Sequence, residues 1–350
     1  KEDMESRNNI IMNLNIIFIL LIFLITLNTN NTTLANNVKN SAVVFMYHKF
    51  DVPKYPSTNI RPEQFDAHLN EFSKQKYNIL SLNYIMDTIV NDGDLPENSI
   101  GISIDDADKS FLTYAWPRLK EKGFPVTLFV STSTISVNKN YLTWDQIRSL
   151  KDEGVTIGAH SHNHSHFTEM SDKEIINEIE KSNRIFLKEL KEIPLIFAYP
   201  YGEADEKVFK ILKDYKYKVA FGQHSGVINE TSNYYYLPRF SLNERYGDIE
   251  RVKFAANLKG LGVYDFIPAN PKISDNPPFI GFSLLDQNLV ISIDCFVYDQ
   301  KGQVESETFK FNERIEIRLK RELLRGRSRL NCTAKDGSGN WRWFGHQFYL

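Results

Sequence analysis

Four histidines lie within seven residues of this 350-residue chain, in the run Gly-Ala-His-Ser-His-Asn-His-Ser-His that ends at His166. An adjacent pair of carboxylates, Asp105 and Asp106, precedes them. Two imidazoles and one carboxylate form the ligand set of an open catalytic metal site, in which a coordination position is left for water. The second carboxylate would then be free to transfer protons. The pattern therefore predicts a metal-dependent hydrolase.

Spacing alone does not choose among the four histidines. Residues two apart share a face in a strand, whereas a helical turn gives the pairs His160 with His164 and His162 with His166. His160 closes an apolar run, and the chain should turn just after it, which favours His160 with His164 as ligands and leaves the other two outside the site. A solvent-exposed polar turn is the alternative. It would suit a single histidine better than four of the eight in the chain.

Short apolar runs alternate with amphipathic stretches from residue 42 onward, as expected of parallel strands covered by helices on both faces. The helical stretches begin with capping boxes at 143–146 and 171–174, and Gly123 and Gly154 stand where C-caps are expected. Repeated β-α units fit a β/α barrel or a doubly wound sheet. The expected strands are 42–48, 100–105, 126–130, 155–160, 195–199 and 219–224.

Reactive groups stand where these strands end: His48, Asp105, His160, Tyr199 and His224. In a β/α barrel the loops after the strands converge on one mouth, where the active site forms. A doubly wound sheet would gather such groups mainly at its switch point. The regularity favours the barrel.

The chain divides into four segments. Residues 1–37 contain a short apolar run followed by small residues, which predicts a secretory signal peptide and leader; an uncleaved membrane anchor is the alternative. Residues 38–267 hold the barrel, and the proline-rich segment 268–278 is expected to be a linker. Residues 279–350 contain short alternating runs and are expected to form a small, all-β, sandwich-like domain.

The N-terminal segment and the composition limit the compartment and the partners. A signal peptide or an anchor would export the body of the protein, to the periplasm or to the extracellular side of the cell envelope. In that oxidising environment Cys295 and Cys332 could form one disulfide, with two buried thiols as the alternative. A formal net charge of −2 gives no electrostatic footprint for nucleic acid.

Three motifs resemble those of the polysaccharide deacetylases, carbohydrate esterase family 4, in the branch that acts on poly-N-acetylglucosamine. The run Ser-Ile-Asp-Asp at 103–106 resembles their Thr-Phe-Asp-Asp motif. The run from His160 to His164 resembles their His-Ser/Thr-x-x-His motif, and Ala-Tyr-Pro-Tyr-Gly at 198–202 resembles their Arg-x-Pro-Tyr motif. The motifs are specific in this order and spacing, and the resemblance spans about residues 43–239.

The resemblance implies a distorted (β/α) barrel and a divalent metal, usually zinc, although cobalt, nickel or iron also suit such a site. Asp106, His160 and His164 would bind the metal, and Asp105 would be the general base. The backbone N–H of Tyr201 would help to hold the oxyanion. The implied activity is the removal of N-acetyl groups from N-acetylhexosamine units of an exported or cell-envelope polysaccharide.

The chain departs from the family pattern at the arginine of the third motif, where Ala198 stands. Arg239 could orient Asp105 instead, or it could be an ordinary surface ion pair. Two alternatives to a deacetylase therefore stay open. One is a catalytically impaired polysaccharide-binding protein on the same fold, which would not need Asp105 beside a metal ligand. The other is a metal-binding or storage protein, which would explain the histidines but not Asp105.

A second departure concerns the general acid, for which the family often uses a late histidine. No clean match to that motif is present. His224 is the best candidate because it ends a strand, and His48 and His166 are rivals.

Overall fold

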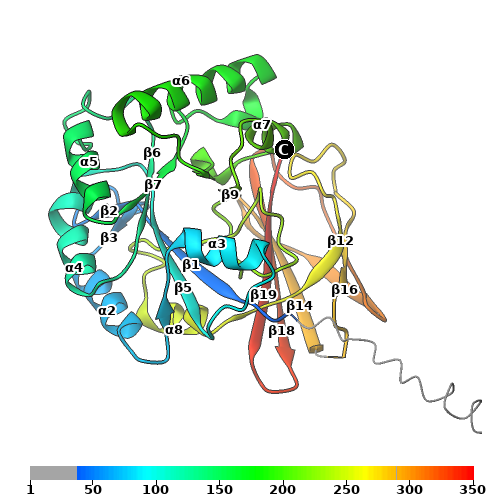
Figure 1. Cartoon of the computed structure of the whole chain (residues 1–350). Coiled ribbons are helices and arrows are strands. Elements are labelled where there is room, and N and C mark those ends of the chain that lie inside the picture. The colour runs from blue at the N-terminus through cyan, green and yellow to red at the C-terminus, as the bar shows by residue number, and fades with distance from the viewer. Residues whose placement is uncertain (1–37, 289) are drawn as a thin grey trace, which may run out of the picture. The chain divides into compact units, whose positions relative to one another are not determined.

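The computed structural model describes residues 38–288 and 290–350. The first part of this chain is a curled parallel sheet with helices along its outer side (Figure 1). Its strand order is β10-β1-β5-β6-β7-β8-β9, with β4 paired to β5. The strands are β1 Ala42–Tyr47, β4 Asn78–Ile79, β5 Ser99–Ile104, β6 Thr127–Val130, β7 Thr156–Ala159, β8 Ile196–Ala198, β9 Val219–Phe221 and β10 Phe240–Ser241. A separate short pair joins β2 Lys49–Phe50 to β3 Asn59–Ile60.

Helices follow most of these strands. They are α2 Pro62–Phe72, α3 Leu82–Val90, α4 Trp116–Glu121, α5 Trp144–Asp152, α6 Asp172–Leu190, α7 Glu206–Asp214 and α8 Ile249–Ala256. The capping boxes at 143–146 and 171–174 are both formed, at the start of α5 and α6. Gly123 and Gly154 take the positive φ angles of C-cap glycines after α4 and α5. The local start and stop signals of these helices are thus confirmed.

Residues 237–241 connect the two edges of the parallel sheet. The N–H of Leu237 donates to the C=O of Ala220 in β9 at 2.9 Å. Three and four residues later, Phe240 and Ser241 pair with β1. The sheet therefore closes on itself as a distorted β/α barrel, which confirms the expected fold.

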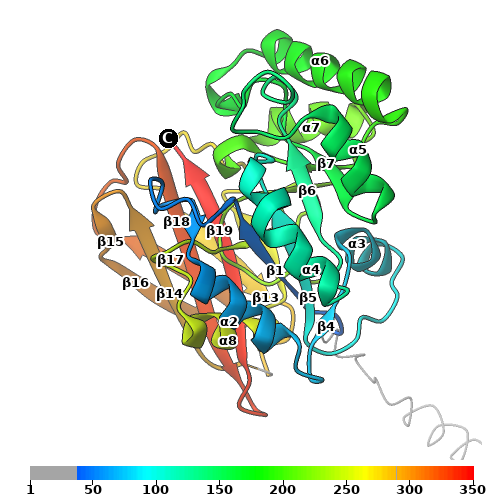
Figure 2. The same cartoon turned by 90° about the vertical axis from the view of Figure 1, so that its left-hand side faces the viewer.

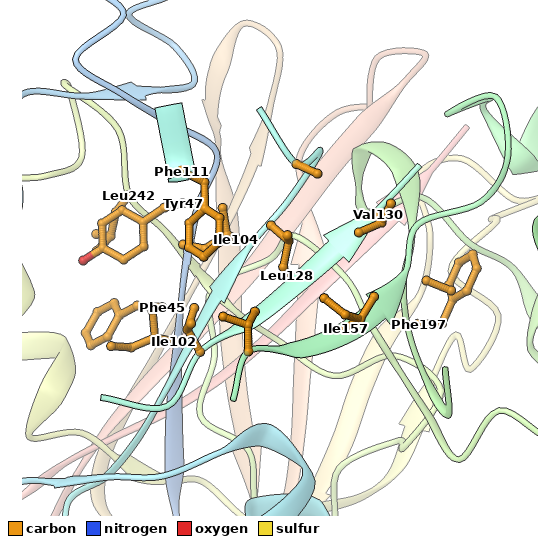
Figure 3. Packing of buried hydrophobic residues seen from close by; sticks show 14 of the residues in the cluster. Phe45, Tyr47, Ile102, Ile104, Phe111, Leu128, Val130, Ile157, Phe197 and Leu242 are labelled. Carbon is orange, nitrogen blue, oxygen red and sulfur yellow. The ribbon is translucent and has the colours of Figure 1, made fainter. Parts of the chain in front are cut away.

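Apolar side chains pack the outer face of the sheet against the surrounding helices (Figure 3). Phe45, Ile102, Ile104 and Leu128 come from neighbouring strands and are buried in one continuous core. Branched and aromatic side chains of this kind pack well on a pleated surface. The inner face of the sheet contributes a second buried cluster, which includes Val44, Phe129 and Phe221.

The C-terminal part of the chain forms two further sheets, whose strands run beside one another in Figures 1 and 2. Buried residues from both sheets, among them Val297, Ile315 and Leu330, share one core, as in a sandwich. A disulfide between Cys295 and Cys332 joins β14 to β18. The sheet orders are β11-β19-β18-β14-β15 and β12-β13-β17-β16. The strands are β11 Lys259–Gly260, β12 Val263–Ile267, β13 Ile280–Leu284, β14 Val290–Asp299, β15 Gly302–Val304, β16 Ser306–Phe311, β17 Arg314–Leu319, β18 Arg327–Asp336 and β19 Trp341–Tyr349.

These two sheets begin before the expected linker. Strands β11 and β12 precede Pro268, yet they pair with β19 and β13. The proline-rich segment 268–278 also contacts the last strand, since the N–H of Tyr349 donates to the C=O of Pro271 at 2.8 Å. The prolines mark a break between strands rather than a spacer between domains. Local composition could not show this, because the partners of β11 and β12 lie later in the chain.

The expected signal peptide and leader, residues 1–37, lie outside the described residues. Within the part of the chain that the structure describes, no helix has the length and apolar character that crossing a membrane requires.

Candidate metal-dependent active site

Asp106, His160 and His164 come together just beyond the ends of β5 and β7. Oδ1 of Asp106 lies 3.5 Å from Nε2 of His160 and 3.3 Å from Nε2 of His164. One potential ligand atom from each residue lies within 4.8 Å of the others. These are the three residues that the sequence singled out, and two imidazoles with one carboxylate suit a divalent metal.

The surroundings of His160 fit a metal ligand. Its Nδ1 lies 2.7 Å from the C=O of Ala198, which can accept the proton of that nitrogen. Such a contact fixes the tautomer and leaves Nε2 free to bind a metal. Nε2 is buried and has no hydrogen-bond partner among the described residues. A buried polar atom without a partner is costly, and a metal ion would satisfy it.

The charges of the site also favour a cation. Burial raises the pKa of Asp106, but the nearby imidazoles of His160 and His164 lower it more, to well below its ordinary value. Burial lowers the pKa of His160, whereas the carboxylates of Asp106 and Asp105 raise it more, so that the net shift is upward. Two ionised carboxylates therefore face the imidazoles, and a divalent cation would neutralise them.

The backbone around the site is held in sparsely populated conformations. Positive φ angles occur at Asp106 (75°), Ser161 (64°), His164 (58°) and Tyr201 (59°), none of which is glycine. Conformations of this kind cost roughly 1–3 kcal/mol each and persist where the surroundings impose them. At His164 one such constraint is visible, because its N–H donates to Oγ of Ser161 at 3.0 Å.

Asp105 is held by Arg239 in a two-point ion pair. Nη1 and Nη2 of Arg239 lie 2.7 Å and 2.9 Å from the two carboxylate oxygens of Asp105. Neither side chain is exposed, so the alternative of a surface ion pair is wrong. Arg239 also donates to the C=O of Gly222 and to Oγ of Ser103. Burial raises the pKa of Asp105, but Arg239, with His160 and His48, lowers it more and keeps this carboxyl ionised.

His48, rather than His224, lies beside the carboxylates. Nε2 of His48 is 4.0 Å from Oδ2 of Asp105. The ring of His224 instead packs on Tyr236 and on His346 of β19, with centroids 4.7 Å and 6.0 Å away. Burial lowers the pKa of His224 well below its usual value, and its Nδ1 has no partner among the described residues. Both histidines follow strands, but only His48 faces the site.

The turn after β8 carries Tyr201 to the site. Its ring lies edge-on to His164, with centroids 4.6 Å apart, and is stacked on His166 at 3.8 Å. The C=O of Tyr201 accepts a hydrogen bond from Nη1 of Arg327 at 3.1 Å. The next C=O, of Gly202, accepts one from Nε2 of Gln347 at 2.9 Å. Strands β18 and β19 therefore hold this turn, a role that no local feature of the sequence indicated.

The other two histidines of the cluster stand outside the metal-ligand group. Nδ1 of His162 lies 2.8 Å from Oγ1 of Thr132. Nδ1 of His166 lies 2.7 Å from Oε2 of Glu203. His166 nevertheless supports the site, because its ring covers that of Tyr201.

Comparisons with known proteins point the same way as the geometry. Residues 92–220 match the family model described as polysaccharide deacetylase. The chain is 24% identical over 222 residues to the poly-β-1,6-N-acetyl-D-glucosamine N-deacetylase of Staphylococcus aureus, which covers 59% of this chain and 75% of that protein. Among solved structures, the fold is similar to that of Streptococcus pyogenes deacetylase PplD in complex with acetate. That match has a TM-score of 0.57 at 22% identity and covers 62% of this chain and 99% of the other. The structure of IcaB from Ammonifex degensii matches with a TM-score of 0.56 at 19% identity. That match covers 62% of this chain and 97% of the other.

Proposed function

We propose that the protein removes N-acetyl groups from N-acetylglucosamine units of an exported polysaccharide, which its match to the polysaccharide deacetylase family model over residues 92–220 supports. The observation that carries this proposal is the cluster of Asp106, His160 and His164 beside a carboxylate, Asp105, that a buried arginine holds. The similarity to a poly-β-1,6-N-acetyl-D-glucosamine N-deacetylase supports a β-1,6-linked polymer as substrate.

Each residue would have one task. Asp106, His160 and His164 would hold a divalent metal, with zinc as our choice because two imidazoles and a carboxylate are typical zinc ligands. The metal, when bound, would supply a Lewis acid and lower the pKa of water. Asp105 would accept the proton of the attacking water, in the orientation that Arg239 imposes. The backbone N–H of Tyr201 would donate to the oxyanion, since Arg327 and Gln347 fix the turn that carries it.

We assign the proton donor for the departing sugar amine to His48 in place of His224. The expectation for His224 rested on its position after a strand, which His48 shares. His48 lies within 4.0 Å of Asp105, whereas the described contacts of the His224 ring are with Tyr236 and His346. A general acid must reach the leaving group, and geometry therefore favours His48.

We further propose that the protein acts outside the cytoplasm, on a glycan of the cell envelope. The apolar run within residues 1–37 is typical of a signal peptide, and a disulfide suits an oxidising compartment.

Acetate release from a β-1,6-linked N-acetylglucosamine oligomer tests the proposal. We expect the metal-loaded protein to release acetate, a chelator to abolish the release, and added zinc to restore it. A protein that binds zinc but releases no acetate from any N-acetylated glycan would instead favour the binding-protein alternative.

Replacing His48 with glutamine is expected to lower kcat by about 100-fold, which is the lower end of what a positioned acid contributes. Metal content should stay unchanged, because His48 is not among the three ligands. His224→Gln is the matched control, and we expect it to retain turnover at temperatures where the protein stays folded. Loss of turnover in His224→Gln with normal metal content and melting temperature, and none in His48→Gln, would reverse the assignment.

A further inference from the structure

A groove of about 800 Å³ is lined in part by Asp108, two residues after the metal-ligand candidate Asp106. One wall is the segment 49–58, the other is the segment 138–141, and Asp108 and Ser110 lie between them. We call it the Tyr55 groove, after the most exposed ring in its lining. Its volume falls in the upper range of ligand pockets and exceeds what one small group needs.

The Tyr55 groove is continuous with the site through the backbone. The loop that follows Asp106 is tied to the second wall, because the C=O of Ala107 accepts from the N–H of Leu142 at 3.1 Å. The N–H of Lys109 likewise donates to the C=O of Asn140 at 2.9 Å. Asp108 and Tyr141 also pair as an isolated antiparallel bridge, which fixes the second wall to the loop that follows Asp106. The lining of the groove thus begins two residues from Asp106, within reach of a polymer bound at the metal-ligand cluster.

Tyr55 gives the groove a flat apolar surface. Its side chain is 42% exposed. The ammonium groups of Lys54 and Lys49 lie over the ring, 5.4 Å and 5.7 Å from its centroid, and a sugar ring would have to displace at least one of these flexible side chains or use the remaining ring surface. Pyranose rings present faces of polarised C–H groups, which pack on the electron-rich face of an aromatic ring. The surrounding polar groups can bond to the sugar hydroxyls.

The charge of the lining is positive. Four lysines and two aspartates line the groove, which leaves an excess of two positive charges: Lys49, Lys54, Lys109 and Lys139, with Asp51 and Asp108. Only Lys49 is paired across the groove, at 3.8 Å from Asp108. A groove lined mainly by one sign of charge repels ligands of that sign.

We propose that the Tyr55 groove binds the sugar units next to the one being hydrolysed, and that its lysines select N-acetylated units over deacetylated ones. The inference rests on the proposed deacetylation, because each acetyl group removed leaves an amine that is protonated near pH 6. A deacetylated unit entering the groove would meet like charge, whereas an acetylated unit is neutral. Hydrolysis of neighbouring units on this side would therefore be slowed, and the free amines in the product would be spaced apart.

Binding to the Asp105→Asn variant separates this inference from the proposed function, because it needs no turnover. We expect calorimetric titration at pH 6 and low salt to show that a β-1,6-linked N-acetylglucosamine hexamer binds about five-fold more tightly than the glucosamine hexamer. Adding Lys54→Glu and Lys139→Glu should remove or reverse that preference. The control Lys188→Glu, on the exposed side of α6 and outside the groove, should keep it.

The aromatic surface has its own test. Tyr55→Ala should weaken binding of the acetylated hexamer about five-fold, a loss in the range of one aromatic contact. Tyr84→Ala removes a comparably exposed ring from α3, outside the groove, and should not weaken binding. An unchanged preference after charge reversal, or equal losses in Tyr55→Ala and Tyr84→Ala, would overturn the groove inference. Absence of acetate release from the wild type would instead count against the proposed function.

Discussion

Replacing Asp105 with asparagine is expected to lower acetate release by roughly a thousand-fold, within the range that a positioned base contributes. Asparagine has the same shape but cannot accept the proton of the attacking water. The three metal ligands are untouched, so zinc content measured by atomic absorption should stay at the wild-type level. The comparison of turnover per bound metal isolates the base from the metal site.

The matched control for Asp105→Asn is Asp106→Asn, at the neighbouring position. Since Asp106 is the carboxylate of the metal-ligand cluster, this variant should lose metal together with activity. If instead Asp105→Asn lost the metal and Asp106→Asn kept it, the two roles would have to be exchanged.

Removing the partner of Asp105 should be costly for the fold as well. In Arg239→Met the buried carboxylate of Asp105 is left without its two hydrogen bonds from Arg239. Breaking a buried ion pair by removing one partner costs about 3–5 kcal/mol. We expect the free energy of unfolding, measured in urea, to fall by about that amount, and we expect activity to be lost.

A double variant shows whether the lower free energy of unfolding comes from breaking the ion pair between Arg239 and Asp105. Arg239→Met with Asp105→Asn leaves no unpaired charge, so it should be more stable than Arg239→Met alone. Arg239→Lys keeps the charge but not the planar fork, and should fall between the wild type and Arg239→Met in stability. If the double variant is no more stable than the single one, Arg239 stabilises the barrel by packing rather than by holding Asp105.

The fold could be predicted because its signals are local. Capping boxes at 143–146 and 171–174 fix the start of two helices through contacts only three residues apart. Strand ends rich in reactive groups then indicated a barrel, because that architecture brings those ends together. His160 and His164 could be chosen for the same reason, since one closes a strand and the other follows within a single turn.

The contacts that complete the site could not be predicted in the same way. His48 and His224 both follow a strand, and the sequence does not say which side chain faces the carboxylates. Arg239 reaches Asp105 only because residues 237–241 bridge β9 and β1, so its neighbours in space are far away in sequence. Arg327 and Gln347 lie on strands with no recognisable motif. These placements follow from tertiary packing, which local patterns do not contain.

The turn after β8 links catalysis to the order in which the chain is made. Tyr201 and Gly202 are tied to Arg327 and Gln347, which are 126 and 145 positions later. During synthesis, the segments that bear the three metal ligands emerge long before β18 and β19 exist. A nascent chain could gather those ligands while the turn still lacked its partners, because contacts of such long range form late. Competence for hydrolysis would then arrive with the last strands, as the final step of folding.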